Sequence, residues 1–244
     1  MKYGIISDIH SNLPALEVAL GVLADRSVDA YICLGDLVGY GPHPNECCDR
    51  VRELEAICIL GNHDEAVLKP GTEDWFNPYA AAAVLWTRAV LSTQNGDFLR
   101  SLAEQKVIRD ITIVHGALDD PWGYITEPYE ATTTFELMTT PVCLVGHSHF
   151  AEWYELDPEK PDPRHVPATD GRTLTLAEDL RYIVNPGSVG QPRDRDSRSS
   201  CAVYDRDART IEIIRTPYDI KACQRDMLDY GLPPALAYRL TFGV

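Results

Sequence analysis

Short apolar runs alternate with amphipathic stretches along the first 149 residues of the chain. The runs are continuous and rich in β-branched residues, which is typical of buried strands. Between the first two runs, leucines spaced by three or four residues from Leu13 to Leu23 predict a helix with one face on a sheet. This rhythm predicts parallel strands joined by right-handed crossovers. The runs are residues 2–7, 30–34, 56–60, 111–114 and 142–145.

Residues 66–104 interrupt this rhythm, and their pattern predicts a mostly helical insertion. The stretch from Tyr79 to Leu91 is alanine-rich, and Asn95 is placed to cap a second short helix. Residues 106–114 then hold two short strands that predict a hairpin. Other helices are expected near residues 45–53, 129–138, 217–230 and 233–240.

From Phe150 onward, predicted strands follow one another without long helices, which indicates a second sheet of mixed or antiparallel type. Residues 157–171 contain several prolines and predict an exposed loop. The chain shows no internal repeat and no low-complexity linker, so we expect a single domain over residues 1–244. The later strands are expected at residues 151–156, 173–176, 181–184, 201–204 and 211–215.

Composition narrows the class of protein. The chain has 244 residues and is 45% hydrophobic, which is enough to build a core. No apolar run approaches the roughly 20 residues of a membrane span, and no signal peptide is recognised. The seven cysteines form no Cys-x-x-Cys pair and fall partly in apolar runs, so buried free thiols are expected rather than disulfides or zinc ligands. This fits a cytoplasmic protein.

The formal net charge of −15 argues against sequence-independent binding to nucleic acid or to an anionic membrane. A small anionic substrate remains compatible with this charge, provided that cations inside the site reverse the local sign. Whether the chain forms a homo-oligomer is left open.

Side chains that commonly bind metals follow five of the predicted strands. Because the carboxyl ends of parallel strands share one edge of a sheet, these five loops can converge in one crevice. Asp-x-His and His-x-His each place two ligands on nearly extended backbone, where alternate side chains share a side. The residues are Asp8 and His10, Asp36, Asn62 with His63, His115, and His147 with His149.

This set holds more ligands than one ion accepts. Mixed carboxylate and imidazole ligation suits Mn, Fe, Zn or Ni better than Ca or a plain Mg site. Two ions need a shared ligand, and Asp36 on a central loop is the natural bridge. His63 offers a proton near neutral pH, and Asp64 could orient its imidazole, with a place in the first turn of a helix as the alternative.

The short segments that carry these residues resemble, in the same order along the chain, the five sequence blocks of the calcineurin-like metallophosphoesterases. The continuation from Asn185 to Arg193 is similar to the small bacterial and archaeal phosphodiesterase branch of that family. The resemblance implies an α/β fold, a four-layer α/β/β/α sandwich of two mixed sheets flanked by helices. The blocks are Asp8-Ile9-His10, Gly35-Asp36, Gly61-Asn62-His63-Asp64, Val114-His115-Gly116 and Gly146-His147-Ser148-His149.

The resemblance also implies roles for these residues. His63 would bind no metal and would protonate or stabilise the leaving oxygen. Two ions about 4 Å apart would clamp a phosphoryl group and lower the pKa of a bridging water to near 7, so that hydroxide attacks phosphorus. One ion would be held by Asp8, His10, Asp36 and His149, and the other by Asp36, Asn62, His115 and His147.

Further residues are candidates for contacts with a substrate. Asn12 and Asn62 could contact phosphate, although an N-cap is an equal alternative for Asn12. Arg193 could bind a phosphate oxygen through its guanidinium fork, or lie in a solvated mixed-charge loop. Side chains that could line the leaving-group pocket or stack on a nucleobase, with packing or surface positions as alternatives, are Tyr40, His43, Trp75, Phe76 and Trp122.

The sequence thus predicts a two-metal phosphoesterase that hydrolyses a phosphodiester, a nucleotide or a diadenosine polyphosphate. A serine/threonine protein phosphatase of the same superfamily is the alternative. That group usually carries an Arg after the Gly-Asp block and another before the Gly-Asn-His block, whereas here Leu37 follows Asp36 and Leu60 precedes Gly61. A catalytically silent binding scaffold, like the retromer subunit of this superfamily, is a third reading that the retained His63 disfavours.

Overall fold

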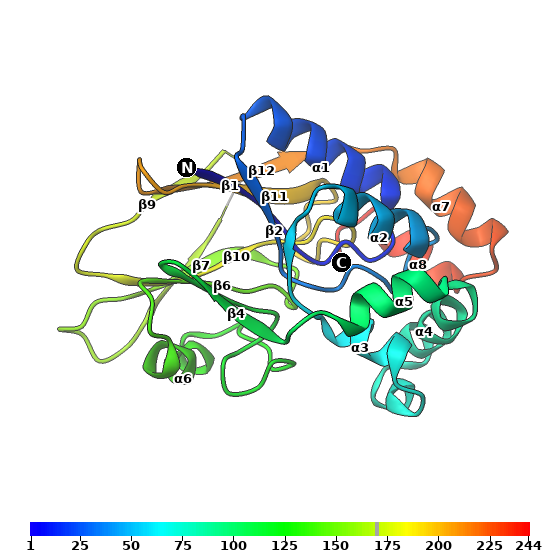
Figure 1. Ribbon diagram of the computed structural model, residues 1–244, viewed down its shortest axis with the longest axis horizontal. Coiled ribbons are helices and arrows are strands. Elements are labelled where there is room, and N and C mark those ends of the chain that lie inside the picture. The colour runs from blue at the N-terminus through cyan, green and yellow to red at the C-terminus, as the bar shows by residue number, and fades with distance from the viewer. Residues whose placement is uncertain (169–170) are drawn as a thin grey trace.

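Two six-stranded sheets form the centre of the computed structural model, which describes residues 1–168 and 171–244 (Figure 1). The first sheet has the order β3-β2-β1-β11-β12-β9 and the second the order β4-β5-β6-β10-β7-β8. The first sheet consists of β1 (Lys2–Ile6), β2 (Ala30–Cys33), β3 (Ile57–Cys58), β9 (Thr173–Thr175), β11 (Ser199–Asp205) and β12 (Thr210–Thr216). The second consists of β4 (Gln105–Ile108), β5 (Ile111–Val114), β6 (Val142–Leu144), β7 (Ala151–Leu156), β8 (Arg164–Pro167) and β10 (Arg181–Pro186).

Both sheets are mixed. In the first, β1 runs parallel to β2 and antiparallel to β11, and β2 runs parallel to β3. In the second, β6 runs parallel to β5 and β10, while β4, β7 and β8 pair antiparallel with their neighbours. The carboxyl ends of β1, β2, β5 and β6 carry the chemistry described below.

Alternation of side chains along the central strands builds the layers. Ile5 of β1 packs in the core between the two sheets, while Ile6 packs in the core on the outer face of the first sheet. In β6, Val142 lies between the sheets and Cys143 packs in the core on the outer face of the second sheet. Because successive residues of a strand point to opposite faces, continuous apolar runs are needed here, and the predicted four-layer α/β/β/α sandwich is confirmed.

Helices form the outer layers (Figure 1). The first sheet is covered by α1 (Leu13–Asp25) and α2 (Pro44–Glu53), and the second by α6 (Pro128–Leu137). The segment between β3 and β4 is helical, as predicted for residues 66–104. It consists of α3 (Asn62–Leu68), a 3₁₀ helix (Thr72–Trp75), α4 (Pro78–Val90) and α5 (Thr93–Arg100), and the chain closes with α7 (Ile220–Asp229) and α8 (Pro234–Arg239).

Three local expectations are wrong. Ser92, not Asn95, caps α5, because its hydroxyl accepts from the Asn95 amide at 3.2 Å. The predicted loop over residues 157–171 contains the edge strand β8, although residues 169–170 of it lie outside the described residues. The predicted strand 56–60 shortens to β3: the Ile59 amide still donates to Cys33 O of β2 at 3.1 Å, but Ile59 also forms an isolated bridge with Ala103.

All seven cysteines are buried free thiols, as the sequence predicts. Among the described residues, no helix combines the length and the apolarity that crossing a bilayer requires.

Candidate metal centre

The predicted ligands meet at the carboxyl edges of both sheets. Asp8 and His10 follow β1, Asp36 follows β2, and His115 follows β5. His147 and His149 follow β6, and Asn62 is the first residue of α3. All but Asn62 are almost completely buried, with at most 6% of each residue exposed. The fold therefore brings together residues from positions 8 to 149.

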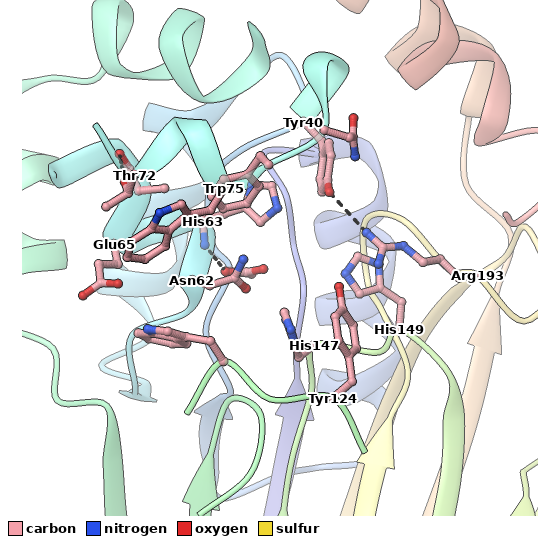
Figure 2. A pocket seen from close by; sticks show the side chains of 15 residues that line it. Tyr40, Asn62, His63, Glu65, Thr72, Trp75, Tyr124, His147, His149 and Arg193 are labelled. Carbon is pink, nitrogen blue, oxygen red and sulfur yellow. Dashed lines mark hydrogen bonds between the residues drawn. The ribbon is translucent and has the colours of Figure 1, made fainter. Parts of the chain in front are cut away.

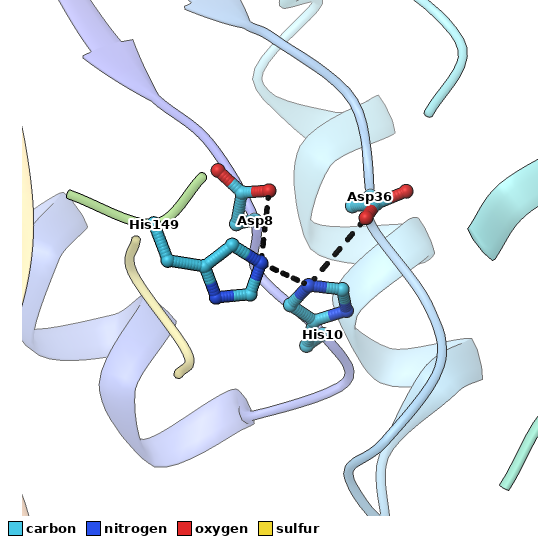
Figure 3. Close-up of side chains that lie close together, drawn as sticks. All are labelled: Asp8, His10, Asp36 and His149. Carbon is cyan, nitrogen blue, oxygen red and sulfur yellow. Dashed lines mark hydrogen bonds and ion pairs between the residues drawn. The ribbon is translucent and has the colours of Figure 1, made fainter. Parts of the chain in front are cut away.

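The first group of ligands contains Asp8, His10, Asp36 and His149 (Figure 3). Nε2 of His10 lies 3.1 Å from Nε2 of His149 and 3.5 Å from Oδ2 of Asp36. Nε2 of His149 lies 3.4 Å from Oδ1 of Asp8. The four candidate ligand atoms all lie within 4.8 Å of one another, which is the spread that ligands around one ion require.

The second group contains Asp36, His115 and His147. Nε2 of His115 lies 3.3 Å from Oδ2 of Asp36 and 3.2 Å from Oδ1 of Asn62, so the asparagine adds a neutral oxygen to this group. Asp36 belongs to both groups, as expected of a bridging ligand. Its Oδ2 has no hydrogen bond within the described residues and faces the imidazoles of His10 and His115.

Three histidines have their tautomer fixed by a backbone carbonyl. Nδ1 of His10 donates to Val38 O at 3.1 Å, Nδ1 of His115 to Leu34 O at 2.7 Å, and Nδ1 of His149 to Gln191 O at 2.6 Å. A carbonyl only accepts, so in the neutral ring the lone pair is on Nε2, which faces the centre. The Nε2 lone pairs of His10 and His149 then face each other at 3.1 Å, which favours a cation between them. The residues present therefore fit a metal ion.

Electrostatics agree with this arrangement. Burial lowers the pKa of His147 to about 3 and the pKa values of His10 and His149 well below their usual range, so these rings stay neutral as ligands must. Burial also acts on Asp36, but His115 and His63 hold the pKa of this carboxyl well below its usual range. Burial alone would lower the pKa of His115, but the nearby Asp36 carboxylate outweighs burial. The net effect raises the pKa of His115 to about 9. The carboxylates thus attract positive charge to the centre.

The backbone is strained at most of these positions. Asp8, His10, Asp36, His147 and His149 have φ between 48° and 66°, in the left-handed region that non-glycine residues rarely adopt. Such strain costs about 1–3 kcal/mol per residue and is typical of functional sites. A neighbouring glycine lets two of these loops pack closely. A Cβ on Gly61 would lie 2.1 Å from Oδ1 of Asp36.

His63 lines the cavity in front of the ligands (Figure 2). Burial lowers the pKa of its imidazole to about 4, so the ring is neutral at neutral pH. Its Nδ1 has no hydrogen-bond partner in the described part of the chain, and its ring packs against Tyr40 and Phe76 at centroid distances of 4.3 and 4.7 Å. His63 is thus close to the ligands and has ring nitrogens available for a substrate.

The predicted role of Asp64 in orienting His63 does not fit the structure. Its Oδ1 accepts from the Val38 amide at 3.0 Å and its Oδ2 from the Gly61 amide at 3.1 Å. The second contact joins the third residue of α3 to the amide of its N-cap residue Gly61, so Asp64 takes the alternative place in the first turn of a helix. Its carboxylate supports the loops that carry Asp36 and Asn62, and within the described residues it makes no hydrogen bond to the His63 imidazole.

The expected phosphate contact of Asn12 also lacks support. Oδ1 of Asn12 accepts from the Ala15 amide, and its Nδ2 donates to Gly190 O and the Tyr218 hydroxyl. The side chain is therefore used as the N-cap of α1. Arg193, in contrast, lines the cavity, where its Nη2 donates to the Tyr40 hydroxyl at 3.3 Å and to Oε1 of Gln191 at 3.0 Å (Figure 2).

A cavity of about 330 Å³ opens in front of the ligands. Tyr40 and Trp122 line it as expected, whereas His43 lies away from it, paired with Asp226 at 3.0 Å. The sequence interpretation missed Tyr124, which lines the same cavity and stacks on His147. Its position two residues after Trp122 in a turn-rich loop was the available signal.

Comparison with known proteins gives the family. A model of the calcineurin-like phosphoesterase superfamily domain matches residues 1–209. The chain is 37% identical to the uncharacterized protein MJ0912 of Methanocaldococcus jannaschii over 251 aligned positions, which cover 98% of this chain and 97% of the relative. The crystal structure of a metallophosphoesterase from Sphaerobacter thermophilus is 40% identical, with a TM-score of 0.89 and full coverage of both chains. A 77-residue stretch is 32% identical to the phosphodiesterase YfcE of Escherichia coli K12, covering 28% of this chain and 42% of YfcE.

This chain therefore belongs to the calcineurin-like phosphoesterase superfamily. It is a metal-dependent phosphoric ester hydrolase, with a cluster of buried His and Asp side chains able to bind metal. The reading as a catalytically silent scaffold is set aside.

Proposed function

We propose that this enzyme uses two divalent transition-metal ions to hydrolyse a phosphodiester, a nucleotide or a diadenosine polyphosphate. The observation that carries the proposal is the position of Asp36, which takes part in two groups of buried ligands at once. One ion would be held by Asp8, His10, Asp36 and His149. The other would be held by Asp36, Asn62, His115 and His147.

The bound ions would supply Lewis-acid charge that activates water and neutralises phosphoryl oxygens. Arg193 and Asn62 line the cavity and can donate hydrogen bonds to the remaining phosphate oxygens. Contacts to Tyr40 and Gln191 hold the Arg193 guanidinium in place before substrate arrives. Preorganised donors of this kind stabilise charge that develops in the transition state.

His63 is the candidate for assisting the leaving oxygen. Within the part of the chain that the structure describes, its Nδ1 lacks a hydrogen-bond partner although the side chain lines the cavity, and His63 belongs to neither group of ligands. A neutral imidazole carries one N–H, which can be donated to an oxygen that gains negative charge as the ester bond breaks. The 77-residue similarity to YfcE, whose name is phosphodiesterase, supports a diester as substrate.

Metal analysis and a substrate panel test the proposal together. After loading with manganese, we expect two ions per chain and hydrolysis within a panel of mono- and diester model compounds, cyclic nucleotides, diadenosine tetraphosphate and a phosphopeptide. Asp36→Asn should lose both bound metal and activity, because it weakens a ligand of both ions. Asp226→Asn, a carboxylate paired with His43 outside the cavity, is the matched control and should keep both.

One ion per chain in the active wild-type enzyme would contradict the two-metal proposal. Preference for the phosphopeptide over every small ester would favour the protein phosphatase alternative.

A further inference from the structure

The outer part of the cavity is lined by aromatic side chains that are unusually exposed. Trp75 is 79% exposed and Tyr124 is 51% exposed, and both line the cavity that contains His63 and His147. Single exposed apolar residues are common on proteins, but two large rings on the wall of one cavity indicate a binding surface. Ligand pockets commonly combine such rings with a few convergent polar groups.

Trp75 and Phe76 are neighbours that both line the cavity but differ in how far they are buried. Phe76 packs inward, 4.7 Å from the ring of His63, and joins the hydrophobic cores near α3 and α4. Trp75 ends the 3₁₀ helix and points to the cavity side, with no hydrogen bond or ring contact among the described residues (Figure 2). Packing therefore accounts for Phe76, and it leaves Trp75 without a structural role.

Tyr124 has one face covered and the rest of its ring half-exposed. Its ring stacks on that of His147, with centroids 4.0 Å apart and an interplanar angle of 24°. In the view of Figure 2, Asn62 and His147 lie between the side chains of Trp75 and Tyr124. In this view the two rings lie on opposite sides of these candidate ligands, and both belong to the lining of the same cavity.

The net charge of the chain gives a further reason for aromatic side chains in this cavity. A chain with a formal net charge of −15 repels an anionic substrate at long range. Affinity must then come from short-range contacts, and stacking on an aromatic face is independent of the protein's net charge. The cavity volume of about 330 Å³ is at the lower end of the range of about 300–1,000 Å³ for small-ligand pockets. It suits one planar ring beside a phosphate.

We propose that Trp75 and Tyr124 form a stacking subsite for a planar aromatic group, a nucleobase or an aryl ring, carried by the phosphate ester. The inference rests on the proposed function, because the ligand groups must hold the phosphate for the ring to reach this subsite. Trp75 is the better probe of the two, since Tyr124 contacts His147 and its removal would disturb a candidate ligand.

The test compares two inhibitors that share a sugar phosphate and differ only in the base. Inhibition of the manganese-loaded enzyme by AMP and by ribose 5-phosphate is measured with bis-p-nitrophenyl phosphate as substrate, alongside quenching of tryptophan fluorescence. Wild type should bind AMP more tightly. Trp75→Ala should weaken AMP roughly 5- to 150-fold, the range expected for loss of one base–aromatic stack, and leave ribose 5-phosphate unchanged. Trp75→Phe should restore most of the preference.

Tyr129→Ala is the matched control, because Tyr129 is 74% exposed on α6 and does not line the cavity. It should bind both inhibitors as wild type does. Equal weakening of both inhibitors in Trp75→Ala, or an AMP preference that survives the substitution, would overturn the inference while hydrolysis continues. If the metal-loaded chain hydrolyses no phosphate ester at all, the proposed function itself fails.

Discussion

Single hydrogen bonds decide which ring nitrogen of each histidine faces the centre. His10, His115 and His149 each donate Nδ1–H to a backbone carbonyl, which directs Nε2 at the carboxylates. Their acceptors are carbonyls of Val38, Leu34 and Gln191, which carry no signal in their side chains. The residue types in the sequence thus indicated which side chains are candidate ligands. The backbone carbonyls, whose positions the fold sets, orient those imidazole rings.

His63→Ala should lower kcat by roughly 10²–10⁴-fold, because it removes the N–H offered to the leaving oxygen. Metal should be retained, since the contact from His63 to Asp36 uses the backbone amide, 2.9 Å from Oδ1. Steady-state kinetics and elemental analysis of the same sample measure both quantities. His43→Ala, a histidine outside the cavity, is the control. Full activity in His63→Ala would refute the assigned role.

At the scale of elements, caps and sheet edges correct the sequence predictions. Asn12 caps α1 and also joins this helix to the loop at Gly190 and to Tyr218 near α7. The strand β8 lies at an edge of the second sheet, where its proline, Pro167, is tolerated. Local composition could not reveal either role, because both depend on partners far away in the sequence.

Asn12→Ala should lower the free energy of unfolding by about 1–3 kcal/mol, from the lost cap and the lost bond to Gly190. KM should stay unchanged, because both polar atoms of the side chain are used inside the fold. Denaturant unfolding and steady-state kinetics measure the two effects. Asn12→Ser, which keeps a capping oxygen, should recover part of the stability. An increase in KM with unchanged stability would instead establish a substrate contact.

Across the whole molecule, the candidate metal centre joins the two sheets. Asp8, His10 and Asp36 come from loops of the first sheet, and His115, His147 and His149 from loops of the second. Buried carboxylates from the first sheet and imidazoles from the second face one another across this junction. Ion binding to the folded chain should therefore stabilise the packing of one half against the other.

Chelation should lower the melting temperature, and manganese should restore it. When the free ion concentration is 100 times the dissociation constant, binding adds about 2.7 kcal/mol to the free energy of unfolding. For a chain of this size, that raises the melting temperature by roughly 5–11 °C. Differential scanning calorimetry with and without EDTA measures the shift. Asp36→Asn should respond to neither treatment. Identical melting of the wild type in EDTA and manganese would argue against a metal at the junction.

The sequence by itself determined the two-sheet fold and the set of ligand types, because strand periodicity and strand-end chemistry are local properties of the chain. Tertiary structure decided the rest. It used Asn12 and Asp64 at the starts of helices, directed Nε2 of His10, His115 and His149 at the centre, and left Trp75 exposed while Phe76 packs against the cores. Each of these outcomes depends on which distant backbone or side-chain atoms occupy the neighbouring space, and that information exists only once the chain has folded.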